Sequence, residues 1–166
     1  MRWPVPATGT TRSTNALIAL GLRLRSRACR PFNSDTKIRV QLPFQVRFYY
    51  PDASVTCRPN PQRDAFQDEP IVVVEVVSAD TRRIDEGEKW LAYAAIPSLA
   101  VYLLVEQESA QVVALRRTET GFVREVHSGL AAIVPLTEID CELPLAELYD
   151  GIEFATASRR GENAPP

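Results

Sequence analysis

Histidine and cysteine are scarce in this sequence, and each scarcity argues against a kind of site. Its 166 residues include one histidine and three cysteines, and Cys29, Cys57 and Cys141 form no CxxC pair, which argues against a zinc centre. Scattered cysteines in odd number predict reduced thiols in a cytoplasmic protein. The lone His127 lies near a predicted strand end and is expected to be a surface residue rather than a general base. Ser78 has no matching histidine nearby in the pattern, which argues against a serine nucleophile.

Long apolar runs and a strong net charge are also missing. No segment approaches the roughly 20 apolar residues of a membrane span, and the N-terminus lacks a secretory pattern, so we expect no membrane partner. The formal net charge of −2 means that a nucleic acid would be held by a local patch rather than by the field of the whole protein. With 45% hydrophobic and 24% charged residues, the composition predicts one globular domain.

Hydrophobic periodicity predicts an α/β domain over residues 11–152, between an irregular segment at 1–10 and a flexible tail at 153–166. Helices are expected over 13–28, capped by Ser13 or Thr14, and within 78–97. Strands are expected over 36–42, over 45–50 and 53–57 as two halves of one strand, and over 71–77, 101–106, 111–117 and 121–126. Residues 59–70 are predicted to form an exposed loop. This order predicts a mixed central sheet flanked by helices.

The stretch FYYPDASVTC, residues 48–57, contains two residues that a buried strand disfavours. Pro51 cannot donate to a sheet ladder, and aspartate is depleted in strand interiors. Such breaks tend to occur at functional sites, which makes Asp52 a candidate. The alternative is that Asp52 is an ordinary turn residue behind Pro51.

Glu75 is the one acid in IVVVEVV, a β-branched run typical of a strand that is buried on both faces. A buried carboxylate must be protonated, bonded to a cation or turned toward a cleft. If the strands of Asp52 and Glu75 are neighbours, the two carboxylates can point into one cleft. The alternative is that Glu75 reaches solvent from an edge strand or pairs with an arginine such as Arg82.

Two neighbouring carboxylates repel each other unless a divalent cation or a lysine neutralises them. Their hard oxygen atoms suit Mg²⁺ or Mn²⁺, completed by water and a substrate phosphate, and nothing in the pattern indicates an organic cofactor. A lysine close by would orient the attacking water and stabilise charge at phosphorus. Such a set of residues would hydrolyse a phosphodiester.

Lys89 is the candidate for that lysine. The chain has two lysines, Lys37 and Lys89, against seventeen arginines, so a lysine here favours a role for its compact ammonium group. Helical spacing places Asp85, Lys89 and Tyr93 along one face. The alternative is a solvated helix face on which Lys89 pairs with Asp85.

Four segments in order carry a resemblance to a known family: YYPD, VVEVVSADTRR, DEGEKWLAYAAIPSLAVYLLV and PLAELYDGI. Over residues 26–152 the chain resembles the Uma-type family of putative restriction endonucleases, a branch of the PD-(D/E)xK nuclease superfamily. The resemblance implies a restriction-endonuclease-like α/β core whose acids bind a divalent metal. It also implies cleavage of DNA, for which a homodimer would suit double-strand cutting.

The family motifs can be carried over to individual residues. Asp52 matches the acid of the PD motif, and Glu75 matches the acid of the second motif. The lysine that usually follows two residues later is replaced by Val77, and Lys89 matches a lysine displaced onto the next helix. The resemblance therefore implies Asp52 and Glu75 as metal ligands and Lys89 as the water-positioning residue. Supporting side chains are expected from Asp85, Glu88 and Tyr93.

Arginines supply the candidates for contact with DNA phosphates: Arg23, Arg27, Arg82 and Arg83. Against this role, the arginines near the first helix spread around it rather than forming one stripe, and arginines at a helix start are usually solvated.

One part of the family pattern is not found. Family members begin with a hairpin and helix that contribute another acid from a segment resembling EYVDGE, and nothing like it precedes Ser13. The predicted function is a metal-dependent endonuclease acting on DNA. The alternative is a non-catalytic nucleic-acid or protein-binding module that keeps an abbreviated nuclease fold.

Overall fold

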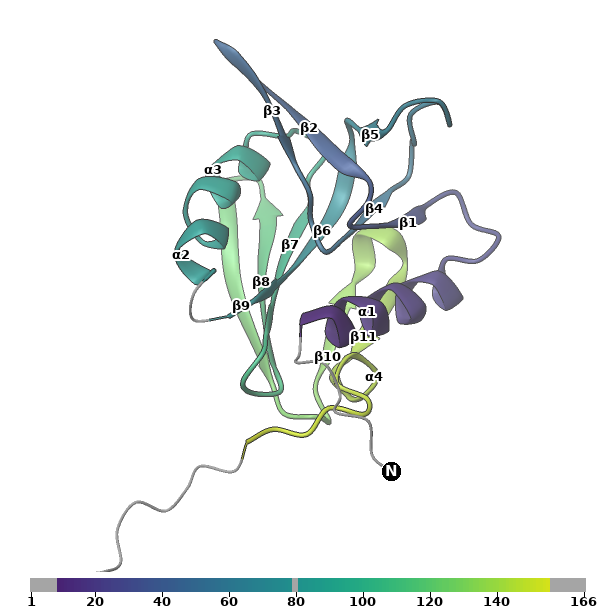
Figure 1. Cartoon of the computed structure of the whole chain (residues 1–166), viewed down its shortest axis with the longest axis vertical. Helices are drawn as coiled ribbons and strands as arrows, with labels where there is room; N and C mark the ends of the chain where they lie inside the picture. Colours follow the sequence, from purple (N-terminus) through teal and green to yellow (C-terminus); the bar gives the residue numbers. More distant parts are fainter. Residues whose placement is uncertain (1–8, 79–80, 156–166) are drawn as a thin grey trace, which may run out of the picture.

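The computed structural model of the chain describes residues 9–78 and 81–155, apart from the side chains of Ile84 and Asp85, and confirms a mixed α/β fold (Figure 1). A six-stranded sheet with the order β1-β4-β6-β7-β8-β9 forms its centre. The strands are β1 (Arg30–Asn33), β4 (Ala53–Thr56), β6 (Pro70–Val77), β7 (Val101–Glu106), β8 (Gln111–Thr118) and β9 (Gly121–Ser128).

The two central strands, β6 and β7, run parallel, whereas every other pair in this sheet is antiparallel. A parallel pair needs a crossover connection, and α2 (Arg82–Asp85) and α3 (Glu88–Ala94) lie within it. Both strands are buried almost throughout, which explains their nearly unbroken apolar sequences.

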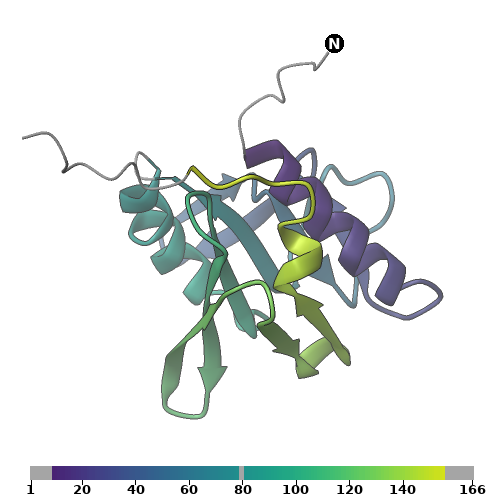
Figure 2. The same ribbon diagram turned by 90° about the horizontal axis from the view of Figure 1, so that it is seen from below.

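Helix α1 (Gly9–Arg23) covers one face of the sheet, and α2 and α3 lie against the other (Figure 2). Ala16 and Leu20 of α1 pack in one core cluster with Val72, Val74 and Leu103 of the sheet. The same cluster takes in residues of β10 (Ile133–Leu136), the short helix η1 (Thr137–Ile139), β11 (Cys141–Pro144) and α4 (Leu145–Leu148). The opposite face forms a second cluster, which includes Val73, Val77 and Tyr93.

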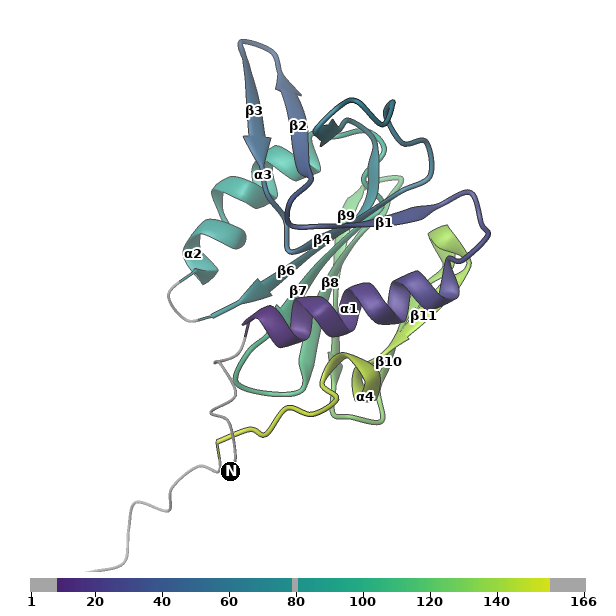
Figure 3. The same ribbon diagram turned by 45° about the vertical axis from the view of Figure 1, so that its right-hand side comes forward.

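A hairpin of β2 (Lys37–Leu42) and β3 (Gln45–Tyr49) extends beyond the central sheet (Figures 1 and 3). With the two-residue strand β5 (Phe66–Gln67) it forms a second sheet with the order β3-β2-β5. Ile38 and Val40 on its inner side belong to the core cluster around Tyr93. The hairpin is therefore anchored to the same face of the central sheet as α3.

Several predictions about the early elements are wrong. The first helix begins at Gly9, inside the segment expected to be irregular, and ends at Arg23. Ser13 lies within this helix, where its hydroxyl donates to the Thr10 carbonyl, so neither Ser13 nor Thr14 caps it. The expected loop over 59–70 contains β5, where Gln67 is buried and its side-chain oxygen accepts a hydrogen bond from the backbone N–H of Asn60. Residues 1–8 and 156–166 of the predicted terminal segments lie outside the described residues.

The strand predicted around Pro51 is two strands in different sheets. β3 ends at Tyr49 and belongs to the three-stranded sheet, whereas β4 begins at Ala53 in the central sheet. Pro51 cannot continue a ladder, so the chain changes sheets between these residues. The helix predicted within 78–97 is likewise divided, because α2 ends at Asp85 and α3 starts at Glu88.

Cys29 and Cys57 form a disulfide with an S–S distance of 2.00 Å, so the prediction of reduced thiols is wrong for this pair. The antiparallel register that pairs Arg30 with Thr56 places the two cysteines opposite each other at the next position. Cys141 remains a free thiol, and its burial raises its pKa. Among the described helices, none is long and apolar enough to cross a membrane.

Candidate functional site

Glu75 lies in the interior of β6 with only 3% of its surface exposed. Its side chain shares a sheet face with Val73 and Val77, because alternate strand residues point to the same side. This is the face that α3 covers. Burying a carboxylate costs several kcal/mol unless cations or hydrogen-bond donors surround it, so its partners decide what it can do.

Two of those partners come from α3. The Lys89 ammonium nitrogen Nζ lies 3.2 Å from Oε2 of Glu75. The Tyr93 hydroxyl donates to the other oxygen, Oε1, at 3.3 Å. Lys89 and Tyr93 are four residues apart, so one turn of helix presents both to the same carboxylate, as the helical spacing predicts.

Aromatic packing holds α3 in this position. The Trp90 ring stacks on Tyr102 of β7 at 5.6 Å and meets Phe122 of β9 edge-on at 4.7 Å. Tyr93 also packs on Tyr102, at 5.5 Å. Such ring pairs fix both the distance of the helix from the sheet and its rotation, and therefore the reach of Lys89.

Asp52 lies directly before β4, next to the strand that carries Glu75. β4 and β6 are antiparallel neighbours in which Ala53 pairs with Val74, so Asp52 and Glu75 occupy the adjoining positions. Oδ2 of Asp52 accepts a hydrogen bond from the backbone N–H of Val76 at 2.7 Å. This bond fixes the carboxylate beside β6, as expected if the break at Pro51 turns Asp52 out of its ladder.

Asp52 and Glu75 provide the donor chemistry that Mg²⁺ or Mn²⁺ prefers. Both offer hard carboxylate oxygen atoms, and Mg²⁺ is commonly held by one or two carboxylates together with water and substrate phosphates. In the described part of the chain, no three or more His, Cys, Asp or Glu side chains gather in a group that could hold a metal ion. By their donor chemistry, the two carboxylates fit a cation whose remaining ligands would be water and phosphate.

The remaining candidates for supporting side chains differ in what they contact. Oε1 of Glu88 accepts hydrogen bonds from Arg47 at 2.6 Å and from the Tyr49 hydroxyl at 3.2 Å, so it ties α3 to β3. The Asp85 side chain lies outside the described side chains.

Three of the four arginines predicted to contact DNA are engaged with carboxylates. Arg23 makes two hydrogen bonds to Glu147, at 2.6 and 2.7 Å, which lowers the pKa of that acid. Arg27 contacts Asp140 at 3.1 Å. Arg82, the predicted alternative partner of Glu75, binds Glu86 and Glu106, whereas Arg83 is exposed.

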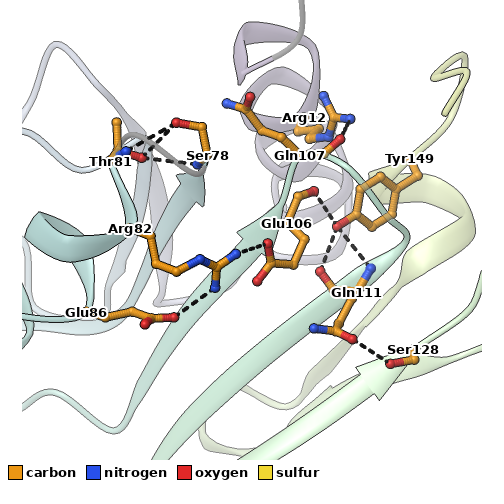
Figure 4. A network of polar contacts seen from close by, with 10 residues as sticks. All are labelled: Arg12, Ser78, Thr81, Arg82, Glu86, Glu106, Gln107, Gln111, Ser128 and Tyr149. Carbon is orange, nitrogen blue, oxygen red and sulfur yellow. Dashed lines mark hydrogen bonds and ion pairs between the residues drawn. The ribbon is translucent and has the colours of Figure 1, made fainter. Parts of the chain in front are cut away.

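Glu106 is a buried acid near this site that the sequence prediction missed (Figure 4). It pairs with Val77 across β6 and β7, which places its side chain on the same sheet face as Glu75. Oε2 of Glu106 lies 2.5 Å from Nη2 of Arg82, at the start of α2. A signal was present, because Glu106 ends the apolar run VYLLVE just as Glu75 interrupts IVVVEVV.

A second polar cluster fixes the end of β7 beside this pair (Figure 4). The Tyr149 hydroxyl donates to the Glu106 carbonyl at 2.8 Å or to the Gln111 carbonyl at 2.7 Å. The buried Arg12 donates to the Gln107 carbonyl, and its burial lowers its pKa. These bonds join α1, β7 and the C-terminal segment behind the candidate site.

The chain is similar to a protein family and to a solved structure that are both described as putative nucleases. A family profile described as Uma2, putative restriction endonuclease, matches residues 3–146. An uncharacterized protein from Synechocystis sp. is 32% identical over 127 residues, which are 76% of this chain and 66% of that protein, just under two thirds of its length.

A solved structure is similar in fold. The crystal structure of a putative nuclease belonging to DUF820 from Anabaena variabilis ATCC 29413 superposes with a TM-score of 0.70. The match covers 89% of this chain and 84% of that one at 16% sequence identity. At this identity the likeness shows a shared fold.

Proposed function

The chain belongs to the Uma2 family of putative restriction endonucleases, and from this premise we propose that it is a metal-dependent nuclease that hydrolyses DNA phosphodiesters. The observation that carries the proposal is the ion pair between Lys89 and Glu75, 3.2 Å long, on the strand next to Asp52. These are the three residues that the family motifs single out. Acids and a lysine collected from three different elements are typical of a site rather than of a surface ion pair.

Asp52 and Glu75 would hold Mg²⁺ or Mn²⁺ through their carboxylate oxygens. The bound cation would supply positive charge for the scissile phosphate and lower the pKa of water. The Tyr93 hydroxyl fixes the orientation of Glu75 through its hydrogen bond to Oε1. The Val76 N–H does the same for Asp52. Both acids are thereby held in place by the protein, which reduces the cost of arranging them around a substrate.

Lys89 would orient the attacking water and stabilise the negative charge that develops on the phosphate oxygens. A lysine suits this task because its ammonium is compact and has three donors that can point in different directions, whereas the arginine fork is planar. Val77 stands where the lysine of the superfamily motif usually lies, two residues beyond Glu75. Lys89 brings an ammonium group to Glu75 from the helix instead of from the strand.

A second function is favoured by a separate observation. Because the described residues contain no group of three acids or histidines for a metal, the chain would also suit a non-catalytic module that binds nucleic acid or protein. The two functions differ in metal response, since a ligand that binds the folded state raises its stability by linkage.

Cleavage of supercoiled plasmid with Mg²⁺ or Mn²⁺ tests the proposal. We expect the parent to nick the plasmid and the variants Asp52→Asn, Glu75→Gln and Lys89→Met to lose this activity. The matched control is Lys37→Met, which replaces the other lysine in the chain, in β2, and should cleave like the parent. Thermal unfolding is measured with and without each metal on the same samples.

The outcomes separate the two functions. Loss of activity in the three site variants together with retention in Lys37→Met would support a nuclease with its site at Glu75. A folded parent that gains no thermal stability from either metal and leaves the plasmid intact would overturn the nuclease proposal in favour of the binding module.

A further inference from the structure

The β2–β3 hairpin exposes a strand edge together with apolar side chains. Within residues 9–78 and 81–155, β3 pairs with β2 alone, so its other edge faces no strand. Phe44, at the two-residue turn of the hairpin, is 100% exposed, and Val46 is 55% exposed. Phe48 is also exposed. An open edge with apolar side chains is a surface on which another chain can add a strand.

The exposed apolar side chains of β3, Val46 and Phe48, lie on one face of the strand, because strand residues alternate between faces. Arg47 and Tyr49 turn toward the core, where Arg47 binds Glu88 and the Tyr49 ring lies 5.5 Å from Tyr93. Val46 and Phe48 therefore point the opposite way. On this outer face the side chains of β3 are apolar, and β2 places Arg39 and Gln41 beside them, opposite Phe48 and Val46. The inner face packs against α3.

The cationic side chains of this hairpin already have partners, which argues against nucleic acid as the ligand that binds its exposed surface. Arg39 makes two hydrogen bonds to Asp68, at 2.7 and 2.8 Å, and this contact lowers the pKa of Asp68. The Lys37 ammonium lies 4.6 Å from the centre of the Phe48 ring. A polyanion gains its affinity from cations that release counterions, and this surface offers few.

The end strand β9 of the central sheet provides a comparison. β9 ends the central sheet and carries exposed apolar residues too, including Val123, which is 51% exposed. There, charged residues alternate closely with the apolar ones, as in the neighbouring Arg124 and Glu125. Charges on an edge disfavour pairing with another strand. In β3 the charged neighbour of Val46 is Arg47, which turns to the inner face and binds Glu88, so no charged residue of β3 lies on the face of Val46.

We infer that β3 pairs antiparallel with β3 of a second copy of this chain, with Val46 on the two-fold axis. In this register Phe44 of each copy lies opposite Phe48 of the other, and Gln45 lies opposite Arg47. All the apolar side chains then meet on one face. A two-fold interface of this kind is self-complementary and closes after two copies.

A different register would be worse. Centring the pair on Arg47 would place two arginines directly opposite each other, and like charges at opposed positions destabilise a sheet. The Val46 register avoids this contact. The interface would bury the two fully exposed Phe44 rings, the exposed parts of two Val46 and two Phe48 side chains, and two backbone edges. Together these amount to on the order of 1,000 Å², which is the lower range for a specific interface. We therefore expect a dimer with micromolar rather than nanomolar affinity.

Sedimentation of the full chain over a micromolar concentration series, with Val46→Lys, tests the dimer. The parent should form a reversible dimer, and Val46→Lys should weaken it at least tenfold because it places two ammonium groups opposite each other. The matched control is Val123→Lys, the same substitution at a similarly exposed residue of β9, an end strand of the central sheet. It should dimerise like the parent.

Disulfide trapping tests the register. In a Cys141→Ser background, Val46→Cys should form a covalent dimer in mild oxidant, because residues opposite each other have Cβ atoms about 5 Å apart. Gln45→Cys, its neighbour, faces Arg47 of the other copy and should cross-link far less. Equal cross-linking of both variants would overturn the register.

The remaining outcomes are decisive for the interface. A parent that sediments as a monomer throughout, or a dimer that Val46→Lys leaves unchanged, would overturn the inference. A monomer that binds single-stranded DNA and loses this affinity in Phe44→Ala, which removes an exposed ring on which bases could stack, would reassign the hairpin to nucleic acid. None of these measurements depends on cleavage, so the inference stands or falls separately from the nuclease proposal.

Discussion

Lys89 reaches Glu75 from a helix of only seven residues, and its Nζ lies 3.2 Å from a carboxylate that is buried in the central sheet. A helix this short has little stability of its own, so packing of its aromatic residues must keep the ammonium in place. The pair thus links the candidate chemistry to the stability of the α3 region.

Replacing Lys89 should destabilise the protein. Lys89→Met leaves the buried Glu75 without its ammonium partner, and loss of one member of a buried pair costs about 3 kcal/mol. The double variant Glu75→Gln/Lys89→Met should recover at least half of this loss, because neither member of the pair then carries a charge. Urea unfolding in the presence of a chelator measures all three proteins.

A surface pair provides the comparison. Arg47→Met removes the 2.6 Å contact to Glu88, whose side chain is mostly exposed, and should change stability far less. If Lys89→Met loses no more stability than Arg47→Met, the ion pair between Lys89 and Glu75 contributes no more to stability than an exposed pair does.

The Cys29–Cys57 disulfide, beside the edge strand β1, should contribute strongly to the free energy of unfolding. Cys29 and Cys57 are 28 residues apart, and closing a loop of this length stabilises a protein by about 3–4 kcal/mol in the chain-entropy account. Cys29→Ser/Cys57→Ser should lose this amount, and reductant should lower the unfolding midpoint of the parent to the same level. Cys141→Ser is the control, since Cys141 is a free thiol. A parent in which mass spectrometry counts three free thiols would contradict the prediction.

The sequence predicts features that depend on local patterns. The β-branched run of β6 is read directly from residues 71–77, and the four-residue spacing of Lys89 and Tyr93 predicts that they share a helix face. The family motifs point to Asp52 and Glu75 in order, and the structure places their positions side by side. Their roles in metal binding and catalysis stay predictions.

Features that depend on long-range register could not be read from the sequence. Cys29 faces Cys57 because of how β1 pairs with β4, and no local pattern specifies that pairing. Arg82 binds Glu106 because two strands run parallel and bring the end of β7 beside α2. Similarly, pairing of arginines with carboxylates from distant segments is invisible to a count of charges along one helix.

Tyr149 should titrate abnormally and make stability fall at alkaline pH. Burial raises its pKa from 10.0 to about 12. Since the folded pKa is the higher one, the stabilisation is fully present below pH 10.0 and is lost as the pH rises toward 12. The absorbance of the phenolate should show a component near pH 12 that disappears in Tyr149→Phe.

The same variant should lose stability at neutral pH. Tyr149→Phe removes the hydroxyl that bonds the Glu106 and Gln111 carbonyls, at a cost of roughly 1–3 kcal/mol. Tyr50→Phe is the matched control, because the Tyr50 ring is exposed. An equal stability of the two variants would show that the polar cluster at the end of β7 contributes nothing.

Gly87 divides α2 from α3, and this division sets the position of Lys89. A Cβ atom at Gly87 would lie 2.5 Å from the backbone oxygen of Arg83, so an alanine there forces the two short helices apart. We expect Gly87→Ala to destabilise the protein by about 1–3 kcal/mol, as overpacking does. Because the shift displaces Lys89 from Glu75, the variant should also lose whatever plasmid nicking the parent shows.

Gly21→Ala is the control for this prediction. Gly21 lies in α1, where an added Cβ would come no closer than 4.0 Å to the Pro31 side chain. Alanine is favoured over glycine inside a helix, so this substitution should raise stability by about 0.5–1 kcal/mol. The two glycines should therefore respond with opposite sign in urea unfolding. A Gly87→Ala variant as stable as Gly21→Ala would mean that α2 and α3 tolerate one continuous helix, and that the reach of Lys89 does not depend on the break.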